Sequence, residues 1–401
     1  MGSPDAKSIR VLYSFPHQLG RTGTGTTAWH QVAGLIEAGQ RVTVMCGTCE
    51  LQLPGHVEVL ETMRLGRWKI PYRAIGVERA WAWHDRQVAK FLEREKSRID
   101  VVHAWPSGAL TTLRTARRLN IKSFLERPNT HTAYAYDVVA REYEKLGLHP
   151  EKKRAHTFNV KRLRREEDEF QMADRLLCPS EFVARTFMER GYSASRISRH
   201  RYGCDPGLFT PDAQPDEQDA FRMVFVGTCD PRKGLHLALR AWLDSPACEN
   251  GEFAICGTFA PGYRELVAKM LAHRSVKELG FRRDVAKIMG QAHALVLPTL
   301  EEGSALVTYE ARAAGCVLLV SEAAGALVDH MSNGLMHRVG DVGTLSQHIT
   351  LLARNRELLA RLRQQSLAQA ATLSWSTAAR ELVDCYAECL RATDQCEMGA
   401  R

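Results

Sequence analysis

The sequence predicts an α/β protein made of two domains, each built on a parallel sheet. In both halves of the chain, short apolar runs typical of buried parallel strands alternate with amphipathic helical segments. Residues 203–216 are rich in Pro, Gly and Asp and form the candidate linker between the two series. The length of 401 residues suits two domains of ordinary size.

The composition narrows the class of protein. Hydrophobic residues make up 45% and charged residues 25%, as in globular proteins. The net charge of +8 is too small to predict a nucleic-acid partner. No apolar run is long enough for a transmembrane helix, and the first ten residues lack the apolar core of a signal peptide. The 11 cysteines are therefore expected to be reduced thiols in a cytoplasmic protein.

The first half opens with a β-α-β unit. A strand at residues 9–14 leads through a glycine-rich loop to a helix at 28–38 and a strand at 41–45. Ser180 is predicted to cap a helix running toward Arg190. Further strands are expected at residues 57–60, 100–103, 122–126, 175–178 and 199–202.

The second half repeats the alternation and ends in a helix at about residues 377–390. Parallel sheets bind ligands at the carboxyl ends of their strands, so we expect the ligand site there. The strands of this half are predicted at residues 222–226, 253–256, 276–279, 294–297 and 317–320.

The clearest chemical signal follows the strand at residues 294–297. A helix beginning near Ser304 would place Glu302 in the preceding loop and Glu310 on the second helical turn. The N–H groups of Ser304, Ala305 and Leu306 would then point at an anion. A carboxylate just inside such a helix suits ribose or sugar hydroxyls. The spacing alone fits a surface glutamate and a capping glutamate equally well.

A second signal joins the strand at 222–226 to a helix at 235–242. Gly227 permits a tight turn, and Lys233 brings an ammonium group near the helix start, where a diphosphate would need neutralising. On its own, the segment also fits a solvated basic loop.

Together these segments resemble the donor site of the retaining glycosyltransferases of family 4. The resemblance rests on Gly227 with residues 232–234, on Pro298, and on Glu302 and Glu310 with seven residues between them. Further similar segments extend it from Arg10 to about Tyr386. The family implies the GT-B fold, with two Rossmann-like domains whose parallel sheets face an interdomain cleft and a C-terminal helix that crosses back.

By this resemblance, residues 1–205 form the acceptor-binding domain, with 376–401 packing back on it, and residues 206–375 bind the nucleotide sugar. The implied activity moves a hexose from a nucleoside diphosphate sugar to an acceptor hydroxyl, for a polysaccharide, a glycolipid or a small-molecule glycoside. The donor is expected to be UDP- or GDP-linked. No cofactor and no metal are implied.

The resemblance also implies roles for individual residues. Lys233 would contact the donor diphosphate, Glu302 the donor sugar and Glu310 the ribose hydroxyls. The candidate catalytic residues are His131, Lys233 and Glu302. The candidate donor-binding residues are Gly25, Gly227, Thr228, Arg232, Lys233, Ser304, Ala305, Leu306 and Glu310.

Two positions depart from the family pattern. Thr228 stands where an arginine is frequent, and Arg232 is a candidate substitute for it. Ala305 carries a Cβ where a glycine would allow closer backbone approach. These departures leave two alternatives open, a non-catalytic sugar-nucleotide-binding protein and a GT-B-type sugar-nucleotide epimerase.

In the first half, His131 follows a strand and resembles the family histidine near the reacting sugar; a loop histidine bonded to backbone is the alternative. His103 also ends a strand and is expected to be structural. The loop at residues 20–27, which contains Gly25, resembles the family loop beside the donor phosphates.

Two basic stretches with interleaved aromatic residues, 64–73 and 152–165, occur in the acceptor half. Such stretches suit an anionic membrane surface, and they leave open a peripheral membrane contact and a lipid-linked acceptor. The acidic run at 166–169 predicts that the second stretch is partly paired within a helix.

Overall fold

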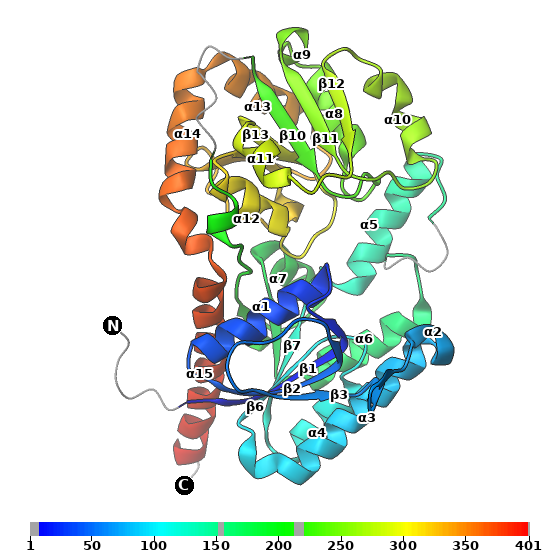
Figure 1. Ribbon diagram of the computed structural model, residues 1–401, viewed down its shortest axis with the longest axis vertical. Helices are drawn as coiled ribbons and strands as arrows, with labels where there is room; N and C mark the ends of the chain where they lie inside the picture. Colours follow the sequence, from blue (N-terminus) through cyan, green and yellow to red (C-terminus); the bar gives the residue numbers. More distant parts are fainter. Residues whose placement is uncertain (1–7, 151–155, 212–219, 400–401) are drawn as a thin grey trace.

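The computed structural model describes residues 8–150, 156–211 and 220–399. Figure 1 shows two halves stacked along the long axis, each with helices packed around a sheet. The first sheet has seven strands in the order β3-β2-β1-β6-β7-β8-β9, and the second has six in the order β12-β11-β10-β13-β14-β15. All strand pairs in both sheets are parallel. The predicted fold class is therefore confirmed.

The first half holds the seven-stranded sheet, a small antiparallel hairpin and the helices that cover them. The sheet strands are β1 (Arg10–Leu19), β2 (Arg41–Cys49), β3 (Glu58–Glu61), β6 (Val101–Ala104), β7 (Lys122–Glu126), β8 (Arg175–Cys178) and β9 (Ile197–Arg199). The hairpin is β4 (Arg64–Leu65) and β5 (Trp68–Lys69). The helices are α1 (Thr24–Glu37), α2 (Tyr72–Ile75), α3 (Val77–Glu95), α4 (Leu110–Arg118), α5 (Thr132–Lys145), α6 (Val160–Met172) and α7 (Glu181–Met188).

The second half holds the six-stranded sheet and its helices. The strands are β10 (Arg222–Val226), β11 (Glu252–Cys256), β12 (Val276–Gly280), β13 (Ala294–Leu297), β14 (Val317–Ser321) and β15 (Gly334–His337). The helices are α8 (Leu235–Leu243), α9 (Ala247–Asn250), α10 (Tyr263–Leu271), α11 (Val285–Gly290), α12 (Leu306–Ala313), α13 (Val342–Arg354), α14 (Arg356–Ala368) and α15 (Trp375–Gly399).

Most predicted strands occur within a residue or two of their expected bounds, but β1 and β2 continue to Leu19 and Cys49, beyond the predicted ends at residues 14 and 45, and further elements differ. Helix α1 begins at Thr24, inside the glycine-rich loop. Strand β15 was not anticipated. The strand expected at residues 199–202 ends at Arg199, because the side chains of His200 and Tyr202 turn inward and hydrogen-bond to the buried Glu126 carboxylate, at 3.0 and 2.9 Å.

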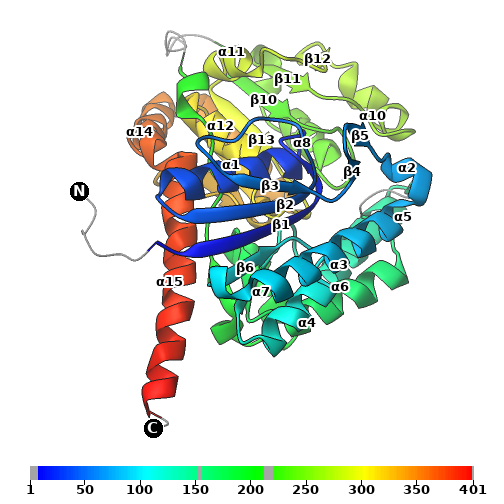
Figure 2. The same ribbon diagram turned by 60° about the horizontal axis from the view of Figure 1, so that its bottom comes forward.

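The C-terminal helix crosses back to the first half, as expected. Figures 1 and 2 both show α15 running from the second half along α1 and the first sheet. Its residues Leu382, Cys385, Tyr386 and Cys389 belong to the apolar core between α1 and that sheet. The buried hydroxyl of Tyr386 lies 2.6 Å from Nδ1 of His103, which gives His103 its expected structural role.

The two halves also meet at the crossing of the chain. Tyr202, Cys204, Tyr309, Ala313 and Leu373 form a small apolar cluster there. Residues 212–216 of the candidate linker lie outside the described residues. Among the described helices, none combines the length and apolar character that a membrane span requires.

Candidate donor site between the two sheets

The carboxyl ends of the two sheets face each other at two loops, one after β7 and one after β13. The backbone N–H and the hydroxyl of Thr130 both donate to Oε1 of Glu301, at 3.1 and 2.9 Å. A Cβ added to Gly303 would lie only 1.9 Å from the carbonyl oxygen of Pro128. The hydroxyl of Ser180 donates to the carbonyl oxygen of Gly303 at 2.6 Å. The halves are therefore in backbone contact at this point.

Three of the predicted site residues form one cluster of charges. Arg232 and Lys233 both pair with the Glu302 carboxylate, and Arg232 also donates to the Glu301 carbonyl oxygen at 2.8 Å. The side chains of Arg232, Lys233 and Glu302 are only 12–15% exposed. Buried charges require such pairing, and here the two cations face the carboxylates of Glu301 and Glu302.

Local backbone geometry places the two cations. Gly234 ends the loop with φ of 71°, and its Cα lies so close to Pro298 that a Cβ would sit 2.2 Å from the carbonyl oxygen. The N–H of Lys233 donates to Asp230 at 2.8 Å. The N–H of Leu300 donates to the carbonyl oxygen of Arg232, also at 2.8 Å. The loops after β10 and β13 are thus tied together, which brings residues 232–233 to Glu302.

The charges in this cluster determine its protonation. Burial alone would raise the pKa of Glu302, but Arg232 and Lys233 outweigh that effect and lower the pKa to about 2. Burial acts to lower the pKa of Arg232, and Glu302 followed by Glu301 outweighs it and raises the pKa. Glu302 and Arg232 are therefore both charged across the physiological pH range.

Glu310 differs from Glu302. It lies on α12, and its partly buried carboxylate has no hydrogen-bond or ion-pair partner among the described residues. Burial raises its pKa to about 6. A carboxylate that has lost water without gaining a protein partner is suited to accept hydrogen bonds from ligand hydroxyls.

One of the three N–H groups predicted for the anion site at the start of α12, that of Ala305, is already bonded. The helix begins at Leu306, and the N–H of Ala305 is already bonded to the carbonyl oxygen of Ala324 at 3.0 Å. The buried Ser304 hydroxyl is likewise occupied by Tyr309 and Gly325. The backbone of Ala305 is extended, so the helix starts one residue later. Within the described part of the chain, the free N–H groups of its first turn belong to Leu306 and Val307.

The remaining glycine and threonine candidates have different environments. Gly227 has φ of 145°, a conformation that favours glycine, at the end of β10. Thr228 is exposed beside it. Gly25 lies in the first turn of α1, where a Cβ would come within 2.4 Å of the Gln18 carbonyl oxygen. Gly25 is thus needed to close the loop that precedes α1.

The structure buries His131 within the first half. Its side chain is the N-cap of α5, with Nδ1 accepting the N–H of Ala133 at 3.2 Å. The ring contacts Phe170, Phe187 and Tyr192, with centroids 5.0–5.9 Å apart. Burial lowers its pKa to about 3, with Arg127 contributing. Its contacts among the described residues all lie in the first half, which favours a structural role.

Sequence reasoning missed three residues that adjoin the cluster. Glu301 is fully buried, Thr130 donates to it, and Nδ1 of His156 lies 3.7 Å from its Oε2. Burial lowers the pKa of His156 even though Glu301 opposes the shift. The sequence drew attention to Glu302 rather than to the adjacent Glu301, and only the fold brings residues 130 and 156 next to Glu301. The described residues contain no group of His, Cys, Asp and Glu side chains arranged to hold a metal.

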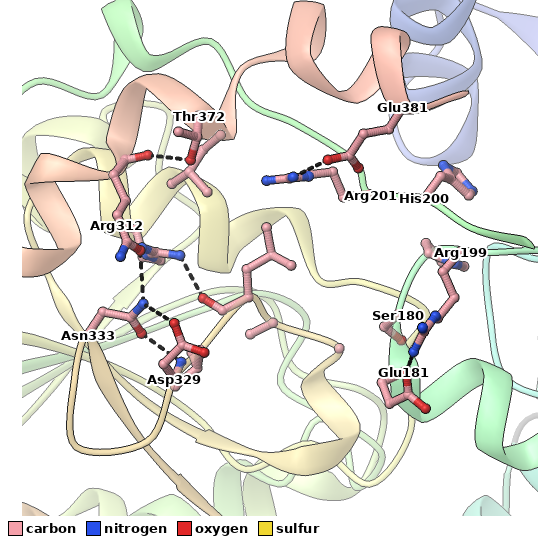
Figure 3. Close-up of a pocket in the computed structure, with 17 residues that line it drawn as sticks. Ser180, Glu181, Arg199, His200, Arg201, Arg312, Asp329, Asn333, Thr372 and Glu381 are labelled. Carbon is pink, nitrogen blue, oxygen red and sulfur yellow. Dashed lines mark hydrogen bonds and ion pairs between the residues drawn. The ribbon is translucent and has the colours of Figure 1, made fainter. Parts of the chain in front are cut away.

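A cavity of about 490 Å³ lies on the other side of this contact, beside the crossing helix (Figure 3). None of the predicted donor residues lines it. Its charged side chains bind one another or the backbone: Arg201 pairs with Glu381, Arg199 with Glu181, and Arg312 with the Leu327 carbonyl oxygen and Gln369 (Figure 3). Of these contacts, the Arg201–Glu381 pair joins the first half to α15, and the others lie within one half.

In the structure, the two basic stretches differ in how their charges are arranged and how exposed they are. In the second, Arg162 pairs with Glu166 and Arg165 with Glu169, each four residues apart on α6, which confirms the expected helix pairing. Its residues 152–155 lie outside the described residues. In the first stretch, the β4-β5 hairpin leaves Leu65 74% exposed and Trp68 70% exposed.

Family models match both halves of the chain. The model for glycosyltransferase family 4 matches residues 21–208, and the model for glycosyl transferases group 1 matches residues 220–355. These two matches together span most of the chain and meet on either side of the candidate linker.

Individual relatives are more distant. The chain is 26% identical over 249 residues to a D-inositol 3-phosphate glycosyltransferase of Streptosporangium roseum, covering 55% of this chain and 57% of that protein. The HepE protein of Anabaena in complex with UDP superposes with a TM-score of 0.65 at 16% identity, covering 95% and 100% of the two chains. Sucrose-phosphate synthase of Thermosynechococcus elongatus gives 0.66 at 17%, covering 96% and 100%. These structures share the GT-B fold, and the chain belongs to the glycosyltransferases of family 4.

Proposed function

We propose that the protein transfers a hexose from a UDP- or GDP-linked sugar to an acceptor hydroxyl, with retained anomeric configuration. Residues 206–375 hold the donor, residues 1–205 hold the acceptor, and 376–401 pack back on the acceptor half. The cluster of Arg232, Lys233 and Glu302 at the carboxyl ends of β10 and β13 carries this proposal. It places two cationic side chains where a parallel sheet binds phosphates.

The proposed reaction breaks the bond between the anomeric carbon and the leaving diphosphate oxygen. The acceptor hydroxyl forms its bond to the same face of that carbon, and its proton passes to the departing diphosphate. Negative charge grows on the diphosphate during this step. Lys233 and Arg232 stabilise that charge, assisted by the free N–H groups of Leu306 and Val307. This chemistry requires no metal ion.

The two glutamates hold the rest of the donor. Glu310 accepts hydrogen bonds from the ribose hydroxyls through its unpartnered carboxylate. Glu302 binds the transferred sugar and is oriented for this by Arg232 and Lys233. Gly227 and Thr228 follow the carboxyl end of β10 and line the donor. Gly25 shapes the loop that faces the donor phosphates from the first half.

The test is a panel of UDP-, GDP-, ADP- and TDP-sugars followed by thermal unfolding and by turnover. D-inositol 3-phosphate is the first acceptor to try, because a relative is named for it. We expect one nucleotide to raise the melting temperature of the wild type and to lose this effect in Lys233→Ala and Glu310→Ala. Binding without turnover would favour a non-catalytic protein, and a free epimerised sugar would favour an epimerase. No response to any nucleotide sugar would refute the donor site.

We also propose a peripheral membrane contact through the first half. Exposed Leu65 and Trp68 on the hairpin lie beside a groove of about 640 Å³. The groove is lined by Met63, Ile70, Ile75, Arg79, Ala82, Trp83 and Arg86. Apolar side chains with arginines that form no ion pair among the described residues suit an anionic lipid surface and a lipid-linked acceptor.

Vesicle sedimentation tests this contact. We expect binding to vesicles containing phosphatidylglycerol, weaker binding to pure phosphatidylcholine, and loss of binding in the Leu65→Ser/Trp68→Ser variant. The Leu279→Ser/Phe281→Ser variant is the control, because these residues are exposed apolar side chains in the second half. Equal binding by both variants would refute the assignment of the surface.

A further inference from the structure

Glu301 is a buried carboxylate of the second half that receives two hydrogen bonds from the first. Its Oε1 accepts both the N–H and the hydroxyl of Thr130, and its side chain is fully buried. Thr130 is fully buried as well. A buried carboxylate is stable only when its oxygens are satisfied, so these two donors are a substantial part of what satisfies the Glu301 side chain.

Glu301 also shares a cation with the donor site. Its Oε2 lies 3.5 Å from Nη1 of Arg232, the same nitrogen that pairs with Glu302. Two adjacent carboxylates therefore compete for one guanidinium. The distances show that Glu302 has the closer pairing while Thr130 satisfies Glu301.

The Thr130 bonds exist only while the two halves are in contact. The segment 128–130 lies directly on the segment 301–303, since Gly303 has no room for a Cβ against the Pro128 carbonyl oxygen. Separation of the halves would remove both donors from Glu301 at once. Glu301 would then lose these two donors but keep Arg232 of its own half 3.5 Å away, so a closer pairing with Arg232 would replace the lost hydrogen bonds.

We propose that Glu301 is a positioning residue that couples closure of the two halves to the placement of Arg232. In the closed state, Thr130 satisfies Glu301 and Arg232 is directed at Glu302 and the donor diphosphate. In the open state, Glu301 draws Arg232 away. This proposal rests on the proposed function and adds to it that the cation site is complete only after closure, which limits reaction of the donor with water.

Thr130→Val and Glu301→Gln test the coupling in the full-length enzyme with its donor and acceptor. Valine keeps the shape of threonine and removes one charge-assisted hydrogen bond, so we expect kcat for transfer to fall about tenfold. The ratio of donor hydrolysis to transfer should rise by a similar factor, and the donor Kd measured without acceptor should change less than threefold. Thermal unfolding shows whether each variant is folded.

The double variant provides the decisive measurement. Glutamine at position 301 carries no charge to attract Arg232, so adding Thr130→Val to Glu301→Gln should cause little further loss. Glu322→Gln is the matched control, because it removes a different, surface ion pair between the halves. There Nη2 of Arg185 lies 2.8 Å from Oε2 of Glu322. It should leave the hydrolysis ratio unchanged.

Three results would overturn the proposal: Thr130→Val leaving kcat and the hydrolysis ratio within twofold of wild type, an equal effect of Glu322→Gln, or additive effects in the double variant. A wild-type enzyme without turnover on any nucleotide sugar would instead refute the proposed function. The two failures are therefore distinguished by the wild-type measurement alone.

Discussion

Replacing Gly303 with alanine would test whether contact between the two halves is needed for activity. The backbone of Gly303 packs against residues 128 and 129 so tightly that a new Cβ would lie 1.9 Å from the Pro128 carbonyl oxygen and 2.5 Å from its carbon. Both neighbours are backbone atoms, which cannot rotate away. The added methyl group is thus expected to push the loop after β13 from the loop after β7.

The size of the effect follows from the cost of overpacking, about 1–3 kcal/mol. The clash occurs between the halves, so the molecule can relieve it by opening. The ratio of closed to open molecules would then fall roughly 5- to 150-fold, and kcat/KM would fall by up to this factor. The melting temperature should change little, because the core of each half is untouched. Gly34 is a poor comparison, since its Cβ would meet Ala379 of α15 at 2.6 Å.

The assay measures kcat/KM for transfer with the best donor, together with thermal unfolding. Gly343→Ala is the matched control, because a Cβ there meets only the Asp341 carboxylate at an ordinary 3.7 Å. We expect Gly343→Ala to keep wild-type activity. If Gly303→Ala keeps kcat/KM within twofold of wild type, the inference that these loops must be in contact during catalysis is wrong.

Three further predictions concern single side chains. Burial raises the pKa of Glu310 to about 6, so the folded protein binds this proton more tightly than the unfolded chain. The buried charge therefore costs folding stability above about pH 6, and this cost disappears as pH falls below about 4. Glu310→Gln should therefore raise the melting temperature of the free protein at pH 7.5 but not at pH 4, and donor affinity should fall below pH 6 in the wild type only; an unchanged melting temperature at pH 7.5 would contradict the unpartnered carboxylate. Lys233→Met should weaken donor binding by roughly 10- to 150-fold in calorimetry, the value of one charge-assisted hydrogen bond, whereas the exposed Lys277→Met should not; equal effects would remove Lys233 from the site. His131→Ala should lower the free energy of unfolding by about 2–5 kcal/mol in urea because it empties a buried aromatic pocket, while kcat per folded enzyme stays within threefold; a large loss of kcat with unchanged stability would restore a catalytic role.

The sequence by itself determined the fold class and, through the family resemblance, the residues that cluster at the carboxyl end of the second sheet. Apolar runs without alternation identify strands buried on both faces, and this signal is local, so β7, β8, β10 and β13 occur where they were predicted. Arg232, Lys233 and Glu302 were named as site residues through the resemblance to family 4, and the structure brings them together at the carboxyl ends of β10 and β13.

Only the tertiary structure decided what depends on contacts between distant segments. Helix α12 begins at Leu306 rather than near Ser304, because the N–H of Ala305 donates to the carbonyl oxygen of Ala324. No local pattern in the sequence encodes that bond. His131 follows a strand as a site residue would, yet the packing of α6 and α7 surrounds its ring with aromatic side chains. Glu301 gained its proposed role from Thr130, a residue of the other half. Hydrogen bonds of this kind depend on how the two halves meet, which hydrophobic periodicity cannot specify.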